Sequence, residues 1–130
     1  MSNRLTYYDF AYDEYEYLLQ AYRLGLRYNA MVSQAQRICE CLMKHLLTVR
    51  MFNVGDIMMS HNLRDIYNFI EKTGIDISPI RNSVMTLNNF YTHTRYPGRD
   101  AFLAKAEDVE VSVQAIIECM SLLAPMFGDN

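Results

Sequence analysis

The sequence predicts an all-α protein: an antiparallel four-helix up-and-down bundle with one additional short helix. Apolar residues recur every three to four positions over most of the 130 residues. No stretch of any length alternates apolar and polar residues as a half-buried strand would. The five glycines and three prolines fall mostly where these helical patterns stop, so they mark the expected helix ends.

A first helix is expected from about Thr6 to Gly25. Thr6 can cap its start, because a threonine oxygen accepts hydrogen bonds from the free N–H groups of a first turn, and Asp9 follows three positions later. Gly25 suits its end, since glycine readily adopts the left-handed conformation common there. The apolar positions at helical spacing are Ala11, Tyr15, Leu18, Leu19, Tyr22 and Leu26.

A second, longer helix is expected from about Asn29 to Arg50. On its exposed face we expect Arg37, Glu40 and Lys44, at three- and four-residue spacing that allows ion pairing. His45, in the middle of this helix among leucines, is expected to be a satisfied, partly buried side chain. The predicted buried stripe consists of Val32, Ala35, Ile38, Cys39, Leu42, Leu46 and Val49.

Three further helices follow. Ser60 is a suitable N-cap for a short one that ends near Gly74. Ser78-Pro79 begins a fourth, with proline in the first turn, where its missing N–H has no cost. The last begins near Ala104 and ends at Pro125. Their apolar stripes are Leu63, Ile66, Tyr67 and Ile70, then Ile80, Val84, Leu87 and Tyr91, and finally Val109, Val113, Ile116, Ile117, Met120 and Leu123.

Composition indicates one globular domain spanning residues 1–130, since 51% of the residues are hydrophobic and 21% charged. A net charge of −3 argues against binding phosphate through a broadly basic surface, although a local basic patch stays open. Three cysteines without a CxxC pair indicate reduced thiols in a cytoplasmic protein. We expect no membrane span, because no run approaches the ~18 apolar residues that one needs.

Four segments, taken in order, resemble the HEPN family, named for nucleotide binding in higher eukaryotes and prokaryotes. Residues 35–47 read AQRICECLMKHLL, similar to the family's alanine- and glutamine-led helix with leucine pairs. His61-Asn62-Leu63 is close to the family's His-Asp-Leu signature. Arg95-Tyr96-Pro97 matches its Arg-Tyr-Pro segment, with Gly98 where aspartate is more usual. A closing amphipathic helix completes a pattern that covers nearly the whole chain.

The resemblance implies a helical bundle that usually forms a homodimer. Family members are often encoded beside a minimal nucleotidyltransferase, as a toxin with its antitoxin, and others serve larger proteins as nucleotide-binding or dimerising modules. For this chain it implies a homodimeric interaction or nucleotide-binding module. Its candidate partners are a nucleotidyltransferase and a nucleotide or RNA.

The ribonuclease members of the family carry an arginine followed, after four to six residues, by a histidine, in a site assembled across the dimer. No arginine of this chain has a histidine at that distance. Arg81-Asn82 resembles the start of the motif, but Thr86 and Leu87 stand where histidine is required, and neither acts as a general acid or base near neutral pH. His93 lies twelve residues after Arg81, ~18 Å from it along a continuous helix. We therefore expect no conventional ribonuclease activity; the alternative is a ribonuclease toxin with a displaced active site.

The candidate ligand-binding residues are His61, His93, Arg95, Tyr96 and Arg99. His61 stands at a helix start, where free N–H groups favour anions, and could bind a nucleotide or else pin that helix to its neighbour. Arginine suits bidentate phosphate contacts, but Arg95 and Tyr96 could instead tie the following turn to the bundle. In both cases we favour the structural interpretation. We assign no catalytic residue and no cofactor, and no metal, because the three histidines lack ligand spacing.

Tyrosine is abundant, with ten residues, and five of them stand at the start of the first helix. One helix face cannot bury all five. The apolar ring and polar hydroxyl of tyrosine suit interfaces, so we expect part of this set, with Phe10, to lie in a subunit interface. The alternative is a thick core with hydroxyls at its rim. The five are Tyr7, Tyr8, Tyr12, Tyr15 and Tyr17.

The expected turn at Tyr96-Pro97-Gly98-Arg99 yields a first prediction. Proline and then glycine at its two central positions suit a type II turn that directs Arg95 toward the bundle and Arg99 outward. Arg95→Ala should lower the free energy of unfolding by about 1–3 kcal/mol, because buried acceptors lose their donor. Arg99→Ala should change it by less than about 0.5 kcal/mol. Chemical denaturation measures both; a fully stable Arg95→Ala variant that loses nucleotide or RNA binding would instead make the segment a ligand site.

Overall fold

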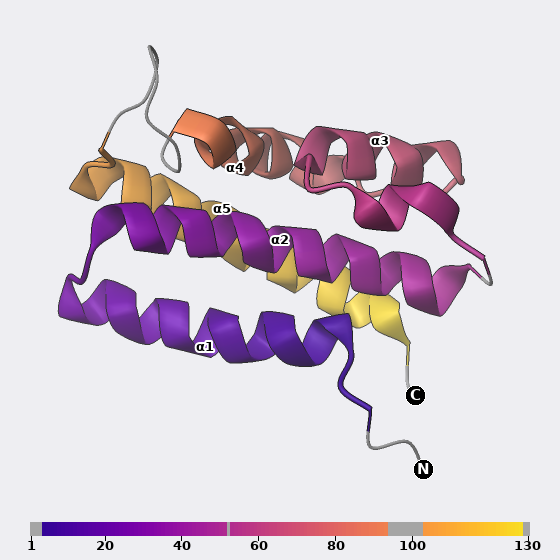
Figure 1. Ribbon diagram of the computed structural model, residues 1–130, viewed down its shortest axis with the longest axis horizontal. Helices are drawn as coiled ribbons and strands as arrows, with labels where there is room; N and C mark the ends of the chain where they lie inside the picture. Colours follow the sequence, from indigo (N-terminus) through magenta and orange to yellow (C-terminus); the bar gives the residue numbers. More distant parts are fainter. Residues whose placement is uncertain (1–3, 52, 94–102, 129–130) are drawn as a thin grey trace.

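The computed structural model describes residues 4–51, 53–93 and 103–128, with the backbone alone at 91–93. This part contains α1 (Tyr7–Leu24), α2 (Tyr28–Arg50), α3 (Leu63–Lys72), α4 (Arg81–His93) and α5 (Ala106–Leu123) (Figure 1). Short 3-10 helices are η1 (Gly55–Met59), η2 (Ser78–Ile80) and η3 (Ala124–Phe127). The described ranges contain no β-strand, so the predicted all-α class is confirmed.

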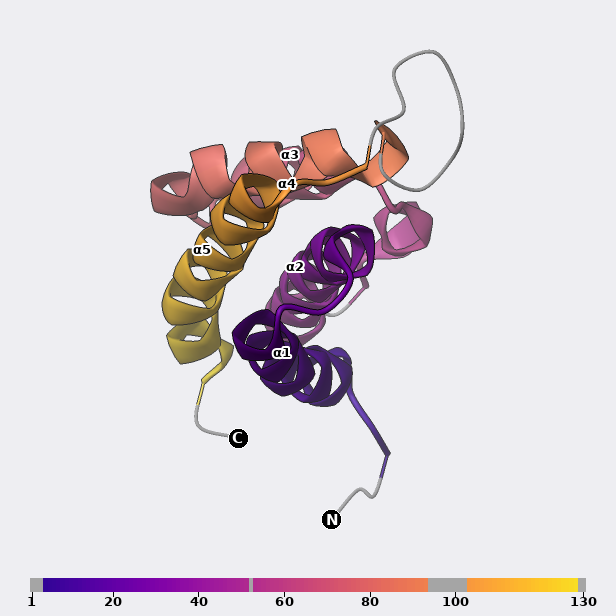
Figure 2. The same ribbon diagram turned by 90° about the vertical axis from the view of Figure 1, so that its left-hand side faces the viewer.

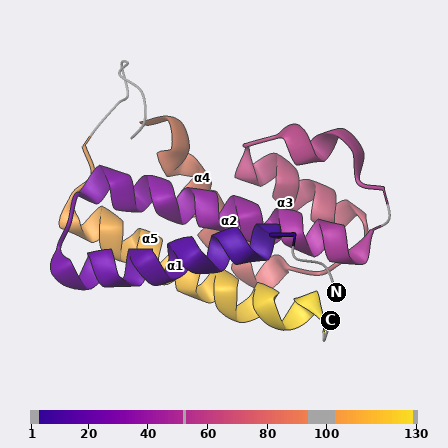
Figure 3. The same cartoon turned by 60° about the horizontal axis from the view of Figure 1, so that its bottom comes forward.

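Helix α2 is the central element of the bundle. It packs along α1 and α5 and also contacts α3 and α4, and the end-on view shows these helices arranged around it (Figure 2). Helix α1 contacts α2 along its length but α5 only slightly, so it lies at the edge of the bundle (Figure 1) and comes to the front when the bottom is turned toward the viewer (Figure 3). The long helices α1, α2 and α5, the medium helix α4 and the short helix α3 match the predicted bundle.

Local hydrogen bonds set both ends of α1 as predicted. The Asp9 N–H donates to Thr6 Oγ1 at 3.2 Å and the Thr6 N–H donates to the Asp9 carboxylate at 2.7 Å, which together form a capping box. Gly25 has a φ of +65° and donates its N–H to carbonyls of the last turn. The helix limits therefore follow from residues next to them in sequence.

The start of α3 differs from the prediction. Asn62, and not Ser60, is the N-cap, because its Oδ1 accepts the Asp65 N–H at 3.0 Å. Ser60 Oγ accepts the N–H of Asn62 at 3.1 Å and so shapes the turn that leads into the helix. Asparagine and serine cap helices about equally well, so composition alone could not decide between them.

The last helix also has different limits. It begins at Ala106 rather than near Ala104, and the Lys105 N–H donates to the Asp108 carboxylate at 2.8 Å at its start. Pro125 does not end the helical path, because it lies in the first turn of η3, where proline is tolerated.

The predicted apolar stripes of α2 to α5 are buried or partly buried wherever the structure describes them; the side chain of Tyr91 lies outside the described residues. At α1 the prediction is wrong at two positions, since Tyr22 and Leu26 are 40% and 43% exposed. Among the described residues, α1 packs mainly against α2 and only slightly against α5, so a stripe as wide as the periodicity indicates cannot be fully covered.

Helix α2 is buried on more sides than one amphipathic stripe predicts. Glu40 and Lys44, expected on its exposed face, are 9% and 3% exposed. The physical reason is its central position, where α1, α3, α4 and α5 all contact it. Arg37 does remain exposed, and its guanidinium pairs with Glu14 of α1 rather than with Glu40.

The segment Ala106–Phe127 is long and apolar enough, by length and composition alone, to cross a membrane. This corrects the expectation that no segment reaches that range. Helices that form the core of soluble proteins pass the same test, and α5 packs against α2 and α4. The composition of this segment is therefore weak evidence for a membrane span.

His45 packs against two aromatic rings, whose centroids lie 5.7 Å (Tyr8) and 4.5 Å (Phe127) from its own. Its Nδ1 is buried without a hydrogen-bond partner among the described residues, so the expectation of a satisfied side chain is wrong. Burial lowers the pKa of His45, and the negative charge of Asp9 opposes this shift only in part.

The lowered pKa of His45 predicts a pH-dependent stability. The unfolded chain binds this proton more tightly than the folded chain, so stability present at neutral pH is lost as the pH falls through the ordinary histidine pKa of ~6.5. Wild type should therefore lose more free energy of unfolding than His45→Phe between about pH 7.5 and 5.5. Chemical denaturation at both pH values measures this, and equal losses in the two proteins would contradict it.

Candidate functional site

The segment His61-Asn62-Leu63, which leads into α3, is held by side chains from two other helices. Gln36 Nε2 on α2 donates to the carbonyl oxygen of His61 at 3.3 Å. The N–H of Leu63 donates to Asn88 Oδ1 on α4 at 2.9 Å. Since Asn62 caps α3, each residue of the segment has a fixed place between α2 and α4.

A mostly buried carboxylate holds the ring of His61. Glu40 Oε2 lies 2.9 Å from His61 Nδ1 and 2.8 Å from Lys44 Nζ. The side chains of Glu40 and Lys44 are 12% and 4% exposed, whereas that of His61 is 65% exposed. Glu40 therefore bridges a buried ammonium group and an exposed imidazole, and His61 pins the start of α3 to α2.

The carboxylate also determines which nitrogen of His61 carries the proton. An ionised carboxylate only accepts hydrogen bonds, so we assign the proton to Nδ1. In the neutral ring, Nε2 is then left as an acceptor on a side chain that is mostly exposed. His61 can therefore accept a hydrogen bond from a ligand hydroxyl or amine, or exchange a proton with it.

The start of α3 offers less to an anion than the sequence indicated. The N–H groups of Leu63 and Asp65 already donate to Asn88 and Asn62. The opposite charges of the Glu40–Lys44 pair also offset each other. An anion at this helix start would therefore meet fewer free N–H groups than an uncapped helix presents.

The other predicted ligand-binding residues cannot be placed beside His61. The backbone of His93 ends α4, but its side chain lies outside the described residues. Arg95, Tyr96 and Arg99 lie outside them altogether, as does the predicted turn. Their role as a ligand site stays a prediction.

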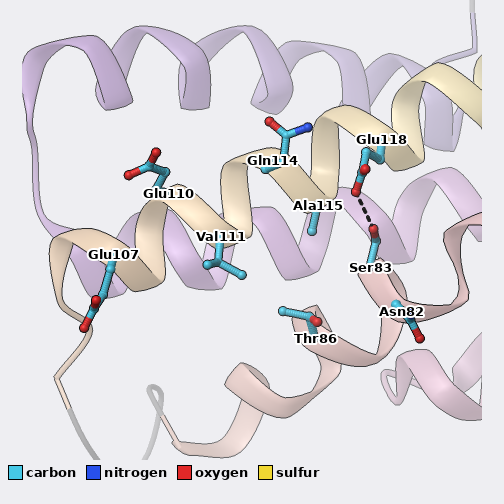
Figure 4. Close-up of a pocket in the computed structure, with 9 residues that line it drawn as sticks. All are labelled: Asn82, Ser83, Thr86, Glu107, Glu110, Val111, Gln114, Ala115 and Glu118. Atoms are coloured by element: carbon cyan, nitrogen blue, oxygen red, sulfur yellow. Dashed lines mark hydrogen bonds between the residues drawn. The ribbon is translucent and has the colours of Figure 1, made fainter.

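Helix α4 begins at Arg81, and its following turns serve other purposes. Leu87 is fully buried in the core, and Asn88 anchors the start of α3. Thr86 lines a groove of about 520 Å³ between α4 and α5 (Figure 4). These residues occupy the positions, five to seven residues after Arg81, where a ribonuclease histidine would stand.

The groove between α4 and α5 is acidic (Figure 4). Glu107, Glu110 and Glu118 of α5 contribute to its lining, and Ser83 of α4 donates its hydroxyl to Glu118 at 2.8 Å. The described residues that line it include no lysine, arginine or histidine. A groove of this charge repels the phosphate backbone of RNA.

No group of three or more His, Cys, Asp or Glu side chains among the described residues could hold a metal ion. The cysteines are free. A hydrogen bond with Cys119, together with burial, raises the pKa of Cys39 well above its usual value, and burial raises the pKa of Cys41 to about 11. These two thiols stay protonated at neutral pH and are poor nucleophiles, which leaves His61 as the better candidate for acid–base chemistry.

These features define a class of protein: an all-α bundle whose His-Asn-Leu segment is fixed to the central helix through an acidic residue. A family model described as HEPN domain matches residues 7–124, nearly the whole chain. The chain therefore belongs to the HEPN family, a family of nucleotide-binding and ribonuclease-associated modules, as its sequence indicated. Neither the curated proteins nor the solved structures contain a significant match.

Sequence reasoning missed Glu40 and Lys44 as members of this site. The available signal was a polar row at four-residue spacing, formed by Gln36, Glu40 and Lys44 within a helix of mostly apolar residues. All three are buried, and the first two contact His61. Such a row indicates a buried polar contact when the helix has neighbours on every side.

Because Lys44 and His61 share the Glu40 carboxylate, removing Lys44 alone should cost more stability than removing the charges of Lys44 and Glu40 together. Lys44→Met leaves Glu40 buried with one partner fewer and should lower the free energy of unfolding by roughly 3 kcal/mol. Adding Glu40→Gln removes the uncompensated charge, so the double variant should recover most of that loss. Chemical denaturation measures both.

The control for this prediction is Ser83→Ala, which removes an exposed hydrogen bond with Glu118 and should cost about 1 kcal/mol or less. Equal losses in Lys44→Met and in the double variant would show that the buried charge of Glu40 does not determine the cost.

Proposed function

We propose that this HEPN domain is a dimeric binding module that recognises a nucleotide or a partner protein and does not cleave RNA. One observation carries the proposal: the positions after Arg81 that would supply a nuclease histidine hold a core leucine, an anchoring asparagine and a threonine in an acidic groove. None of these side chains can transfer a proton near neutral pH.

The proposed ligand site is the exposed edge of His61. Its Nε2 can accept a hydrogen bond from a ribose hydroxyl or a base amine, while Glu40 keeps the ring oriented. We include His93, Arg95, Tyr96 and Arg99 in the proposed site, because arginine suits phosphate and these residues are close in sequence.

The proposed partner protein is a minimal nucleotidyltransferase, as in the toxin–antitoxin pairs of the family. A homodimer is the proposed assembly, because HEPN domains commonly dimerise. The cytoplasm is the proposed location, since free cysteines suit a reducing compartment.

A ribonuclease with a displaced active site is the second candidate, and one observation favours it. His61 has its Nδ1 bound by a carboxylate and its ring exposed, an arrangement that also suits a general base. The two candidates differ in whether RNA is cut.

Two assays on the purified protein separate the candidates. Without added metal, wild type should leave tRNA and mRNA intact and should bind a fluorescent ATP analogue. His61→Ala should weaken that binding by about tenfold, the equivalent of one hydrogen bond of ~1.4 kcal/mol. Gln20→Ala, an exposed change on α1, should leave it unaltered.

Cleavage in wild type that disappears in His61→Ala or His93→Ala would favour the ribonuclease. ATP-analogue binding that is equal in wild type and His61→Ala would remove His61 from the proposed site.

A further inference from the structure

Exposed apolar side chains are concentrated on and around α1. Of twelve large hydrophobic residues exposed in the described part of the chain, nine lie between residues 5 and 28. Scattered exposed apolar residues are normal, but a concentration on one element marks an interaction surface. The nine are Leu5, Tyr7, Phe10, Tyr12, Tyr17, Tyr22, Leu24, Leu26 and Tyr28.

Part of this set forms a stripe of large side chains along one face of α1. Tyr7, Phe10, Tyr17 and Leu24 are three or seven residues apart, so they lie on one side of the helix. Their exposed fractions range from 37% at Tyr7 to 73% at Leu24. Glu14 lies between them on the same face.

Helix α2 carries a matching stripe of smaller side chains. Ala30, Gln34, Cys41 and Thr48 share one helix face, with Arg37 in the middle of the row. Their spacing of three, four or seven residues again gives one continuous line. None of them is fully buried.

The two stripes adjoin. Arg37 Nε lies 2.8 and 3.1 Å from the two carboxylate oxygens of Glu14, which joins the middle of one row to the middle of the other. The surface that they form together, called here the α1–α2 seam, consists of Tyr7, Phe10, Glu14, Tyr17, Leu24, Ala30, Gln34, Arg37, Cys41 and Thr48.

The seam has a hollow on each side of its central ion pair. One, of about 530 Å³, is lined by residues that include Phe10 and Thr48. The other, of about 280 Å³, is lined mainly by apolar groups and includes Tyr17 and Ala30. At each end, therefore, a large aromatic residue of α1 stands beside a small residue of α2.

We propose that the α1–α2 seam is the contact surface between two copies of this chain, related by a two-fold axis that runs along the seam. The inference rests on the dimer of the proposed function and names its surface. Such a rotation lays α1 of one copy on α2 of the other, so the large stripe meets the small one twice. An interface of this kind is isologous and closes at two subunits.

Charge complementarity supports the same arrangement. The axis places Glu14 of one copy opposite Arg37 of the partner subunit, and the reverse, so that two positive and two negative groups alternate around the axis. Each copy presents an 18-residue helix, ~27 Å long, beside a second helix ~10 Å wide. A face of two such helices is of the same order as the ~800 Å² per partner of specific interfaces.

Charge reversal tests this surface. Wild type should have about twice the 15.2 kDa chain mass by light scattering at micromolar concentration. Glu14→Arg alone and Arg37→Glu alone should each weaken the dimer at least about 100-fold, because like charges then meet within and across the seam. An equal mixture of these two variants should restore the dimer, because positive groups then face negative groups across the axis.

Tyr17→Glu and Tyr22→Glu form a matched pair on α1. Tyr17 is in the seam and Tyr22 is exposed on another side of the same helix, so only Tyr17→Glu should dissociate the dimer. Circular dichroism checks that each variant keeps its helices.

A folded Tyr17→Glu dimer, or charge-reversed variants that stay dimeric, would overturn the seam while leaving dimerisation intact. A wild type that is monomeric at every accessible concentration would overturn the dimer itself. Neither result bears on whether the chain binds nucleotide without cutting RNA.

Discussion

The Glu40 carboxylate is held mostly out of water on the central helix. The position of the start of α3 and the orientation of His61 depend on the charge and hydrogen-bond partners of this carboxylate. A carboxylate in this position needs a charge partner and hydrogen-bond donors, because burying it alone is costly. Lys44, one turn along α2, supplies the charge, and His61 supplies a donor from another segment. The start of α3 is thereby fixed to α2, and Asn88 fixes it to α4. The orientation of one exposed imidazole follows from the burial of one carboxylate.

The central helix α2 also contributes to two functional candidates, the His61 site and the α1–α2 seam. Its polar row meets His61 beside α3, whereas the row containing Arg37 adjoins α1 and forms the α1–α2 seam. The two rows lie next to each other around α2, since Glu40 is three residues from Arg37, so a ligand at His61 and a second copy on the seam would occupy neighbouring parts of the surface. The acidic groove between α4 and α5 is another surface, and its charge disfavours the phosphate backbone of RNA.

The sequence predicted the features that are determined by residues close together along the chain. The helices follow from apolar periodicity, and Thr6 and Gly25 mark the ends of α1 because their hydrogen bonds and backbone angles are local. Amphipathic reasoning assumes one buried face, so it misplaced Glu40 and Lys44 on a helix that is contacted from several sides. It also placed Tyr22 in the core, because periodicity does not reveal that α1 lies at an edge. His61 was a candidate from its helix start and its family resemblance, but its contact with Glu40 joins residues 21 positions apart and has no local signal.

Nitrogen NMR of the His61 side chain tests most directly whether Glu40 orients this ring. In the neutral ring we expect Nδ1 to carry the proton and Nε2 to be unprotonated, and we expect this preference to be lost in a Glu40→Leu, Lys44→Met double variant. A wild-type ring protonated at Nε2 would contradict it, because Nδ1 could then not donate to Glu40 and no acceptor would be directed toward a ligand.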